Sequence, residues 1–209
     1  MKRSLLSFAA VVLLAAPVGA QTVGATNPGG VYFRLFGGAT LPTGDFGDVF
    51  DTGWRGGGTV GWQLAGIPVG FDVDVAYDRV GGGTVGPFEV DDLGIISGTA
   101  NVRWDYQGEG PIGFYVAGGG GIYNFQAYDV SGPISVADGL GQRLRLGGGT
   151  GTVEVESETK FGLNGGAGLM FGRSNTRFFV EARYHTVFTD DENANFIPIV
   201  LGVQFGPPR

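Results

Sequence analysis

Alternation of apolar and polar residues is the dominant pattern of this chain, and it is clearest in residues 177–188. One set of alternate residues there is apolar, aromatic or small, and the other set carries Arg177, Glu181, Arg183 and His185. A β-strand sends successive side chains to opposite faces of its sheet, so one face is apolar and the other charged. The apolar face is either buried in the core of a soluble protein or turned outward to lipid.

Eight segments share this alternation. They are residues 31–41, 54–64, 68–78, 94–106, 112–125, 160–172, 177–188 and 196–205. A tilted membrane strand needs about 9–11 residues, whereas strands of soluble proteins average about 5–6. The segments match the membrane length, and an even number of strands is what a single-chain bacterial barrel requires. In the fifth segment, four consecutive glycines obscure the alternation, and we expect Ile112, Phe114, Val116 and Ile122 to face outward.

The connections between these segments alternate in length. Residues 42–53, 79–93 and 126–159 are long connections, and residues 65–67, 107–111 and 173–176 are short ones. Outer-membrane barrels have long loops outside the cell and tight turns in the periplasm. The pattern therefore places both ends of the barrel sequence on the periplasmic side, and the acidic residues 189–195 in a final exposed loop.

Large aromatic residues lie near the ends of the apolar faces. These are Trp54, Trp62, Tyr77, Trp104, Tyr106, Phe171, Phe178, Phe188 and Phe205. Aromatic rings form girdles where a barrel crosses the two membrane–water interfaces. Together with the strand pattern, they predict an all-β protein, an eight-stranded antiparallel up-and-down transmembrane β-barrel within residues 31–209.

The first twenty residues have the organisation of a secretory signal peptide. Lys2 and Arg3 form a positive region, residues 5–16 are apolar, and small residues precede Ala20. This apolar stretch is short for a membrane helix. We predict cleavage after Ala20, a short periplasmic segment over residues 21–30, and export to the outer membrane.

Composition narrows the functional classes. Removal of the two basic residues of the signal peptide moves the net charge from −7 to −9, which argues against a nucleic-acid partner. The chain has no cysteine, so disulfides cannot stabilise it. Glycine contributes 42 of 209 residues, against about 7% in average proteins. Glycines lie within the apolar segments, including 118–121 and 162–168, where we expect the wall to bend or large interior side chains to cross.

Charged residues gather on the face opposite the apolar one. They are Arg34, Arg55, Asp72, Asp74, Asp78, Arg103, Asp105, Lys160, Arg177, Glu181 and Arg183, joined by His185. An eight-stranded barrel is just wide enough for side chains to fill its interior. Because unpaired buried charges are costly, we predict a paired charge network. A narrow channel for small solutes or ions is the alternative.

Three stretches resemble a known family. They are GGATLPTGDFGDVFDTGWRGGGTVGW (residues 37–62), FVEARYH (residues 179–185) and a final strand ending in Phe205. The chain resembles the small Gram-negative outer-membrane β-barrel domains, the OmpA/OmpX-like family. The resemblance implies a barrel surrounded by outer-membrane lipid and lipopolysaccharide, and folded by the barrel-assembly machinery. That machinery reads a C-terminal aromatic strand, whereas here four residues follow Phe205.

Candidate chemistry is sparse. His185 shares a face with Glu181 and Arg183, but its neighbour Thr186 points to the other face and supplies no nucleophile. A lipid-modifying enzyme is therefore the least favoured alternative, and we expect no catalytic residue. Asp45, Asp48 and Asp51 lie at three-residue spacing in an acidic, solvated loop that does not match an EF-hand, so we expect neither a metal nor a cofactor.

The long connection of residues 126–159 contains alternating pieces around glycines. It predicts a hairpin that extends beyond the membrane and offers a surface for a partner. From the sequence we therefore expect a monomeric outer-membrane protein with a structural or surface-interaction role through its extracellular loops.

Overall fold

The computed structural model describes residues 29–107, 110–126, 128–133, 150–172, 175–190 and 192–206. The predicted signal peptide and its cleavage site lie outside the described residues, as do residues 21–28 and 207–209. The export signal and the periplasmic segment therefore stay predictions.

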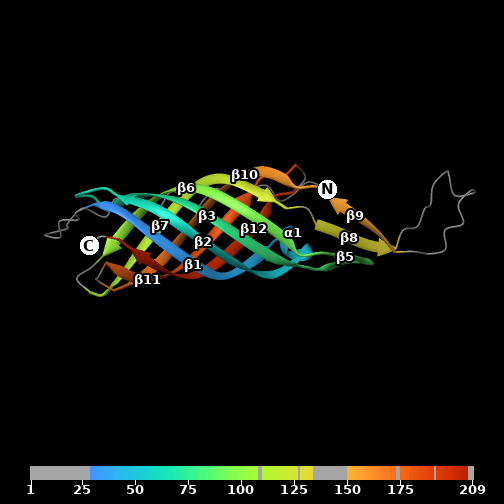
Figure 1. Cartoon of the computed structure of the whole chain (residues 1–209), viewed down its shortest axis with the longest axis horizontal. Helices are drawn as coiled ribbons and strands as arrows, with labels where there is room; N and C mark the ends of the chain where they lie inside the picture. The colour runs from blue at the N-terminus through green and yellow to red at the C-terminus, as the bar shows by residue number, and fades with distance from the viewer. Residues whose placement is uncertain are drawn as a thin grey trace, which may run out of the picture.

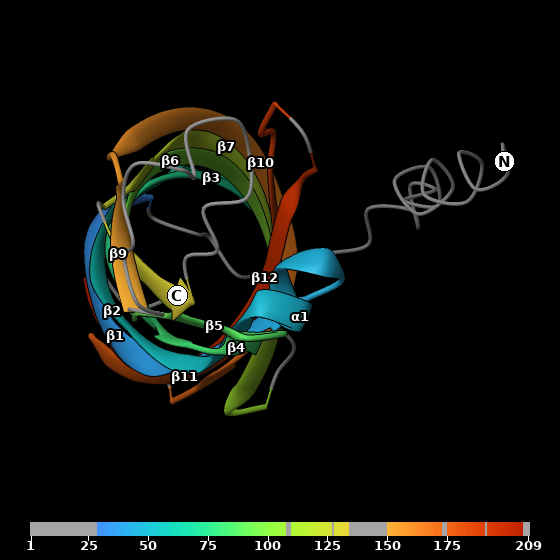
Figure 2. The same ribbon diagram turned by 90° about the vertical axis from the view of Figure 1, so that its right-hand side faces the viewer.

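The chain forms a closed antiparallel barrel of eight strands, which Figure 2 shows end-on as a ring. Its strands are β1 (Gly30–Thr43), β2 (Phe50–Gln63), β3 (Val69–Gly82), β6 (Leu93–Gln107), β7 (Ile112–Phe125), β10 (Glu158–Phe171), β11 (Thr176–Val187) and β12 (Ala194–Phe205). Each strand pairs with its sequence neighbours in the barrel, and β1 pairs with β12 from Phe33 opposite Phe205 to Thr43 opposite Asn195. The predicted fold is confirmed, and all eight predicted segments coincide with barrel strands.

The barrel has its apolar residues outside and its polar residues inside. On β3, Val73 and Val75 are 57% and 61% exposed, whereas Asp72 and Asp74 are 1% and 4% exposed. Exposed apolar side chains recur on every barrel strand, and this distribution is the reverse of a soluble sandwich. The predicted facing of β7 is also confirmed, because its four outward residues, beginning with Ile112, are 42–62% exposed.

Glycines on the inner wall lie beneath large aromatic rings. A Cβ atom at these glycines would collide with the ring of Tyr32 at Gly61, Phe36 at Gly57, Tyr115 at Gly168, Tyr123 at Gly162 and Phe179 at Gly202. The glycine-rich strands therefore make room for aromatic rings inside a narrow barrel.

A second sheet extends from the barrel at the end where a long connection joins β3 and β6 (Figure 1). It consists of β4 (Thr84–Val85), β5 (Phe88–Val90), β8 (Tyr128–Pro133) and β9 (Thr150–Val155), in the order β4-β5-β8-β9. The β8–β9 pair confirms the extended hairpin predicted for residues 126–159. In contrast, β4 and β5 lie where the sequence analysis placed only a loop.

Two hydrogen bonds to Asp92 stabilise the base of this second sheet. The Asp92 carboxylate accepts hydrogen bonds from the Gly82 N–H at 3.0 Å and from Arg79 Nε at 3.1 Å. These hydrogen bonds hold the pKa of Asp92 below its usual range. The bond from the Gly82 N–H has the larger effect, and the bond from Arg79 has the next largest. The connection between β3 and β6 is therefore an ordered structure.

The connection between β1 and β2 contains a short helix, α1 (Asp45–Val49). The predicted long connection, residues 42–53, is shorter in the structure because β1 continues to Thr43 and β2 begins at Phe50. Its Asp45, Asp48 and Asp51 are exposed, as expected of an acidic, solvated stretch. Phe46 and Val49 of α1 pack on buried apolar residues at this end of the barrel. Within the described residues, no helix has the length and apolar character needed to cross a membrane.

Candidate functional site

The described interior contains equal numbers of buried positive and negative side chains. The arginines are Arg34, Arg55, Arg103, Arg177 and Arg183, and the carboxylates are Asp72, Asp74, Asp78, Asp105 and Glu181. All ten were predicted from the alternation to face inward. Five charges of each sign balance one another, which reduces the cost of placing them in a low-dielectric interior.

The layer nearest the short turns is built around Asp72. Tyr32 donates a hydrogen bond from its hydroxyl group to Asp72 Oδ1, and Nη1 of both Arg34 and Arg103 lies 3.9 Å from Asp72 Oδ2. Arg103 Nε donates to Asp105 Oδ2 at 3.0 Å, and its guanidinium lies 4.4 Å from the centre of the Tyr32 ring. Ion pairs and cation–π contacts therefore stabilise the same layer.

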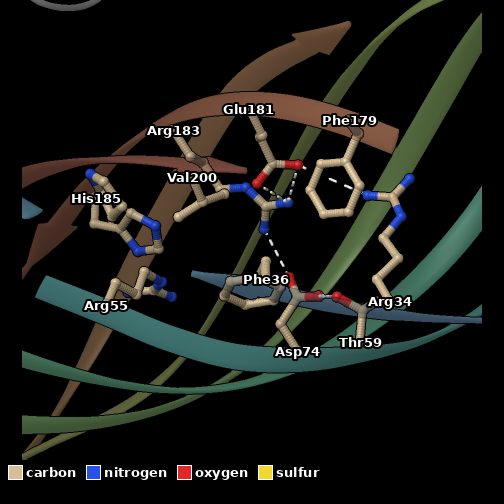
Figure 3. Close-up of a pocket in the computed structure, with 11 residues that line it drawn as sticks. Arg34, Phe36, Arg55, Thr59, Asp74, Phe179, Glu181, Arg183, His185 and Val200 are labelled. Atoms are coloured by element: carbon tan, nitrogen blue, oxygen red, sulfur yellow. Dashed lines mark hydrogen bonds and ion pairs between the residues drawn. The ribbon is translucent and has the colours of Figure 1, made fainter. Parts of the chain in front are cut away.

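Arg183 connects opposite walls in the middle of the barrel (Figure 3). Its Nη1 lies 2.7 Å from Asp74 Oδ2, and its Nη2 lies 2.8 Å from Glu181 Oε1. Tyr115 donates to Glu181 at 2.9 Å, and Asn101 donates to Asp74 at 2.8 Å. Charged groups with several bonds each make this layer a crosslink between β3, β6, β7 and β11.

Asp78 and His185 belong to the layer toward the long loops. Asp78 forms an ion pair with Arg55 and accepts a hydrogen bond from Thr40. His185 Nδ1 lies 2.8 Å from the Tyr123 hydroxyl group, and its ring stacks on Phe196 with the ring centres 4.9 Å apart. His185 is 1% exposed, so a substrate in solution cannot reach it.

Lys160 differs from the other residues predicted to face the interior. It lies near the start of β10, where its Nζ pairs with Glu158 and, at 2.7 Å, with Asp190. The alternation gives the correct side of the strand but does not say where the interior ends. Lys160 therefore belongs to the rim of the barrel instead of the interior network.

An apolar cap closes the interior at the long-loop end. The cap consists of the buried residues Phe50, Val80, Leu93, Ile95, Tyr123, Val187, Ala194 and Phe196. The cap was not predicted from the sequence, although alternation places several of its members, such as Val80 and Val187, on the inner face. The sequence does contain a signal for the cap. The residues on the inner face change from charged to apolar near the loop ends of β3, β6 and β11.

The interior cavity below the cap is small. Its volume is about 10 Å³, and its lining includes Arg55, Arg183 and Pro198. A single water molecule needs roughly 10–15 Å³, so this cavity has room for about one water molecule. The described interior around it is packed, and Arg34, Arg55, Arg103 and Arg183 form ion pairs with its carboxylates.

The predicted aromatic girdle residues lie near the two ends of the barrel wall. At the short-turn end, Trp62, Trp104, Tyr106, Phe178 and Phe205 are 40–63% exposed, and Phe171 is partly buried. At the long-loop end, Trp54 packs on Tyr77 with ring centres 5.4 Å apart, and Phe188 stacks on Phe161. Two bands of rings separated by aliphatic residues are typical of a wall that crosses two membrane interfaces.

The described residues offer little for catalysis or metal binding. They contain no group of three or more histidines, cysteines or carboxylates that could hold a metal ion, and Asp45, Asp48 and Asp51 form no such group. His185 forms its hydrogen bond with the buried Tyr123. Within the described residues, no hydrogen bond joins His185 to a serine or a threonine. These contacts of His185 stabilise the barrel interior.

Comparisons with known proteins identify the fold. No family model matches the chain, and no curated protein matches it in sequence. Among solved structures, Neisserial surface protein A (NspA) matches with 16% identity over 85% of this chain and 98% of that chain, with a TM-score of 0.58.

Two further solved structures match with lower TM-scores. They are Ail of Yersinia pestis (19% identity, 85% of this chain, 99% of that chain, TM-score 0.45) and the N-terminal β-barrel domain of Pseudomonas aeruginosa OprF (14%, 87%, 100%, 0.39). With the strand topology, the NspA match shows that the chain has the fold of the small eight-stranded outer-membrane β-barrels, as the OmpA/OmpX-like resemblance predicted.

Proposed function

We propose that the protein is an integral outer-membrane barrel that acts as a rigid anchor and interacts with its surroundings through the long-loop end. The observation that carries the proposal is the apolar outer wall around a paired, charge-balanced interior. In water such a wall would remain unburied, whereas in lipid the exposed side chains of β3 and β12 match the surrounding hydrocarbon. Outer-membrane lipid and lipopolysaccharide are then its neighbours, and the barrel-assembly machinery inserts it.

The distribution of charge supports a role for the long-loop end. Residues 42–53, 79–93, 126–160 and 189–195 contain fourteen acidic and four basic residues, a net charge of −10. The short connections contain only Glu109 and Arg173. Strong negative charge at one end steers cationic partners toward it and repels anionic ones.

The interior favours an anchor over a channel. A cavity of about 10 Å³ lies beneath the apolar cap, and the buried arginines and carboxylates of the middle layer pair with one another. The surface-interaction role therefore has the better structural support.

Site-directed labelling in intact cells tests this proposal. The natural chain has no cysteine, so Asp48→Cys in α1 and Ile67→Cys in the β2–β3 turn each create one labelling site. A membrane-impermeant maleimide should label D48C in intact cells, and I67C only after permeabilisation. The purified protein should also migrate differently on gels before and after boiling. Fractionation as a soluble protein, or the reverse labelling pattern, would overturn the proposal.

A further inference from the structure

A groove beside α1 combines an apolar floor with an acidic rim. Its volume is about 270 Å³. The floor contains Phe46, Val49, Phe50, Leu93 and Phe125, and the rim contains Asp45, Glu156, Glu158, Thr189, Glu192 and Asn193. The groove lies at the long-loop end on the outer side of the apolar cap, which contributes Phe50 and Leu93 to its floor. It shares no lining residue with the small interior cavity.

The floor of the groove is the outer surface of a packed cluster. The rings of Phe46 and Phe50 lie 4.9 Å apart, and Phe46 also lies 6.4 Å from Phe196 in the cap. Phe46, Val49 and Phe125 are only partly buried, so their apolar surface faces the groove. Because these side chains are already packed, an apolar group can enter the groove with little reordering.

The rim has more negative than positive charge. Lys160 is the cation beside it, and its Nζ pairs with both Glu158 and Asp190. Within the described part of the chain, Asp45, Glu156 and Glu192 form no ion pair, and all three are exposed. A cation entering the groove would therefore meet carboxylates that remain available.

We propose that this groove binds a small cationic amphiphile, a primary amine or guanidine that carries one aromatic or short aliphatic group. The apolar group would lie on the Phe46 and Phe50 floor, and the cation would lie among the rim carboxylates. The volume is slightly below the roughly 300–1,000 Å³ of typical ligand pockets, which fits a single ring. The inference deepens the proposed function. It rests on that function in one respect, because the groove is open to the surrounding solution only if the long-loop end faces outward from the membrane.

Fluorine NMR with 4-fluorophenethylamine as the probe tests the charge requirement. The protein is held in lipid nanodiscs, and empty nanodiscs give the background from partitioning. We expect saturable binding of the amine and at least about tenfold weaker binding of the neutral analogue 2-(4-fluorophenyl)ethanol, because the alcohol cannot pair with the rim. Equal affinities for the two probes, or no saturable binding of the amine, would overturn the inference.

Matched variants locate the site. Glu156→Gln with Glu192→Gln should raise the Kd of the amine several-fold and leave the alcohol unchanged, whereas Phe46→Ala should weaken both. Glu89→Gln with Asp129→Asn removes the same charge elsewhere on this end and should change the Kd less than twofold. Equal effects of the two charge variants would show that the negative charge of the whole long-loop end attracts the amine. That result would overturn the assignment of the binding site to this groove.

Two outcomes separate this inference from its alternatives. The chain itself carries Arg143 and Arg145, outside the described residues. If the amine binds only after both are changed to glutamine, the chain fills its own groove and the proposal of an external ligand fails. If the natural protein and every variant show heat-modifiable migration but none binds the amine, the inference fails and the proposed function is unaffected. If the natural protein shows no heat-modifiable migration, the proposed function itself is contradicted.

Discussion

Glu181 shows how much a single interior residue contributes. Its carboxylate accepts a hydrogen bond from Tyr115 at 2.9 Å and pairs with Arg183 at 2.8 Å and with Arg34 at 3.7 Å. Glu181→Ala leaves two buried guanidinium groups short of negative charge, and it should cost about 3–5 kcal/mol of unfolding free energy. Urea titration of the refolded protein, followed by tryptophan fluorescence, measures the loss.

The exposed pair of Arg79 and Asp92 provides the control for Glu181. Its atoms lie 3.1 Å apart, but the two side chains are 53% and 47% exposed. Arg79→Ala should therefore cost only about 0–1 kcal/mol. Similar losses in the two variants would mean that water screens the interior as it screens the surface.

Gly168 tests the packing of aromatic rings against the inner wall. A Cβ atom at this position would enter the space occupied by the Tyr115 ring, so Gly168→Ala should cost about 1–3 kcal/mol. Gly98→Ala is the control, because the nearest atom to its added Cβ is Ile122 Cγ1 at 4.0 Å. Both variants can be compared by the temperature at which heat-modifiable migration is lost, and equal temperatures would contradict the role given to this glycine.

The sequence predicts which side chains face inward but not which of them meet. Alternation places Asp74 and Arg183 on the inner face, because each follows the two-residue period of its strand. Their contact joins residues 109 positions apart, and it depends on the stagger and closure of the barrel. Lys160 shows the same limit, because its position along the barrel axis decides between the interior and the rim.

At the scale of a strand, the direction of the apolar face can be tested on β12. Leu201 lies opposite Gly37 and Val180 on the neighbouring strands, and it is 64% exposed. Leu201→Arg near the middle of the membrane should cost about 2–4 kcal/mol, whereas Val31→Arg at the end of β1 should cost about 0–1 kcal/mol. Urea titration in lipid vesicles measures both, and a small loss for L201R would show that this wall is not in lipid.

Element prediction succeeded for the long strands and failed for the short elements. Segments of ten or more residues give several repeats of the alternation, so all eight barrel strands were recognised within a few residues of their ends. The five residues of α1 and the two of β4 are too short to show a period. Contacts distant in sequence, such as Phe46 with Phe196, stabilise α1 and leave no local pattern.

At the scale of the whole molecule, a closed interior predicts the electrical behaviour of the protein. The apolar cap covers one end, and the Arg183 layer crosses the barrel below it. The natural protein should therefore show no defined conductance in planar bilayers, and Phe50→Ala with Phe196→Ala should not conduct either because the charged layer remains. Adding Asp74→Ser and Arg183→Ser removes the ion pair that crosses the barrel in that layer without changing the net charge, and should allow brief small currents. Defined currents from the natural protein would contradict the packed interior, because an ion cannot pass a cavity of about 10 Å³ without displacing these side chains.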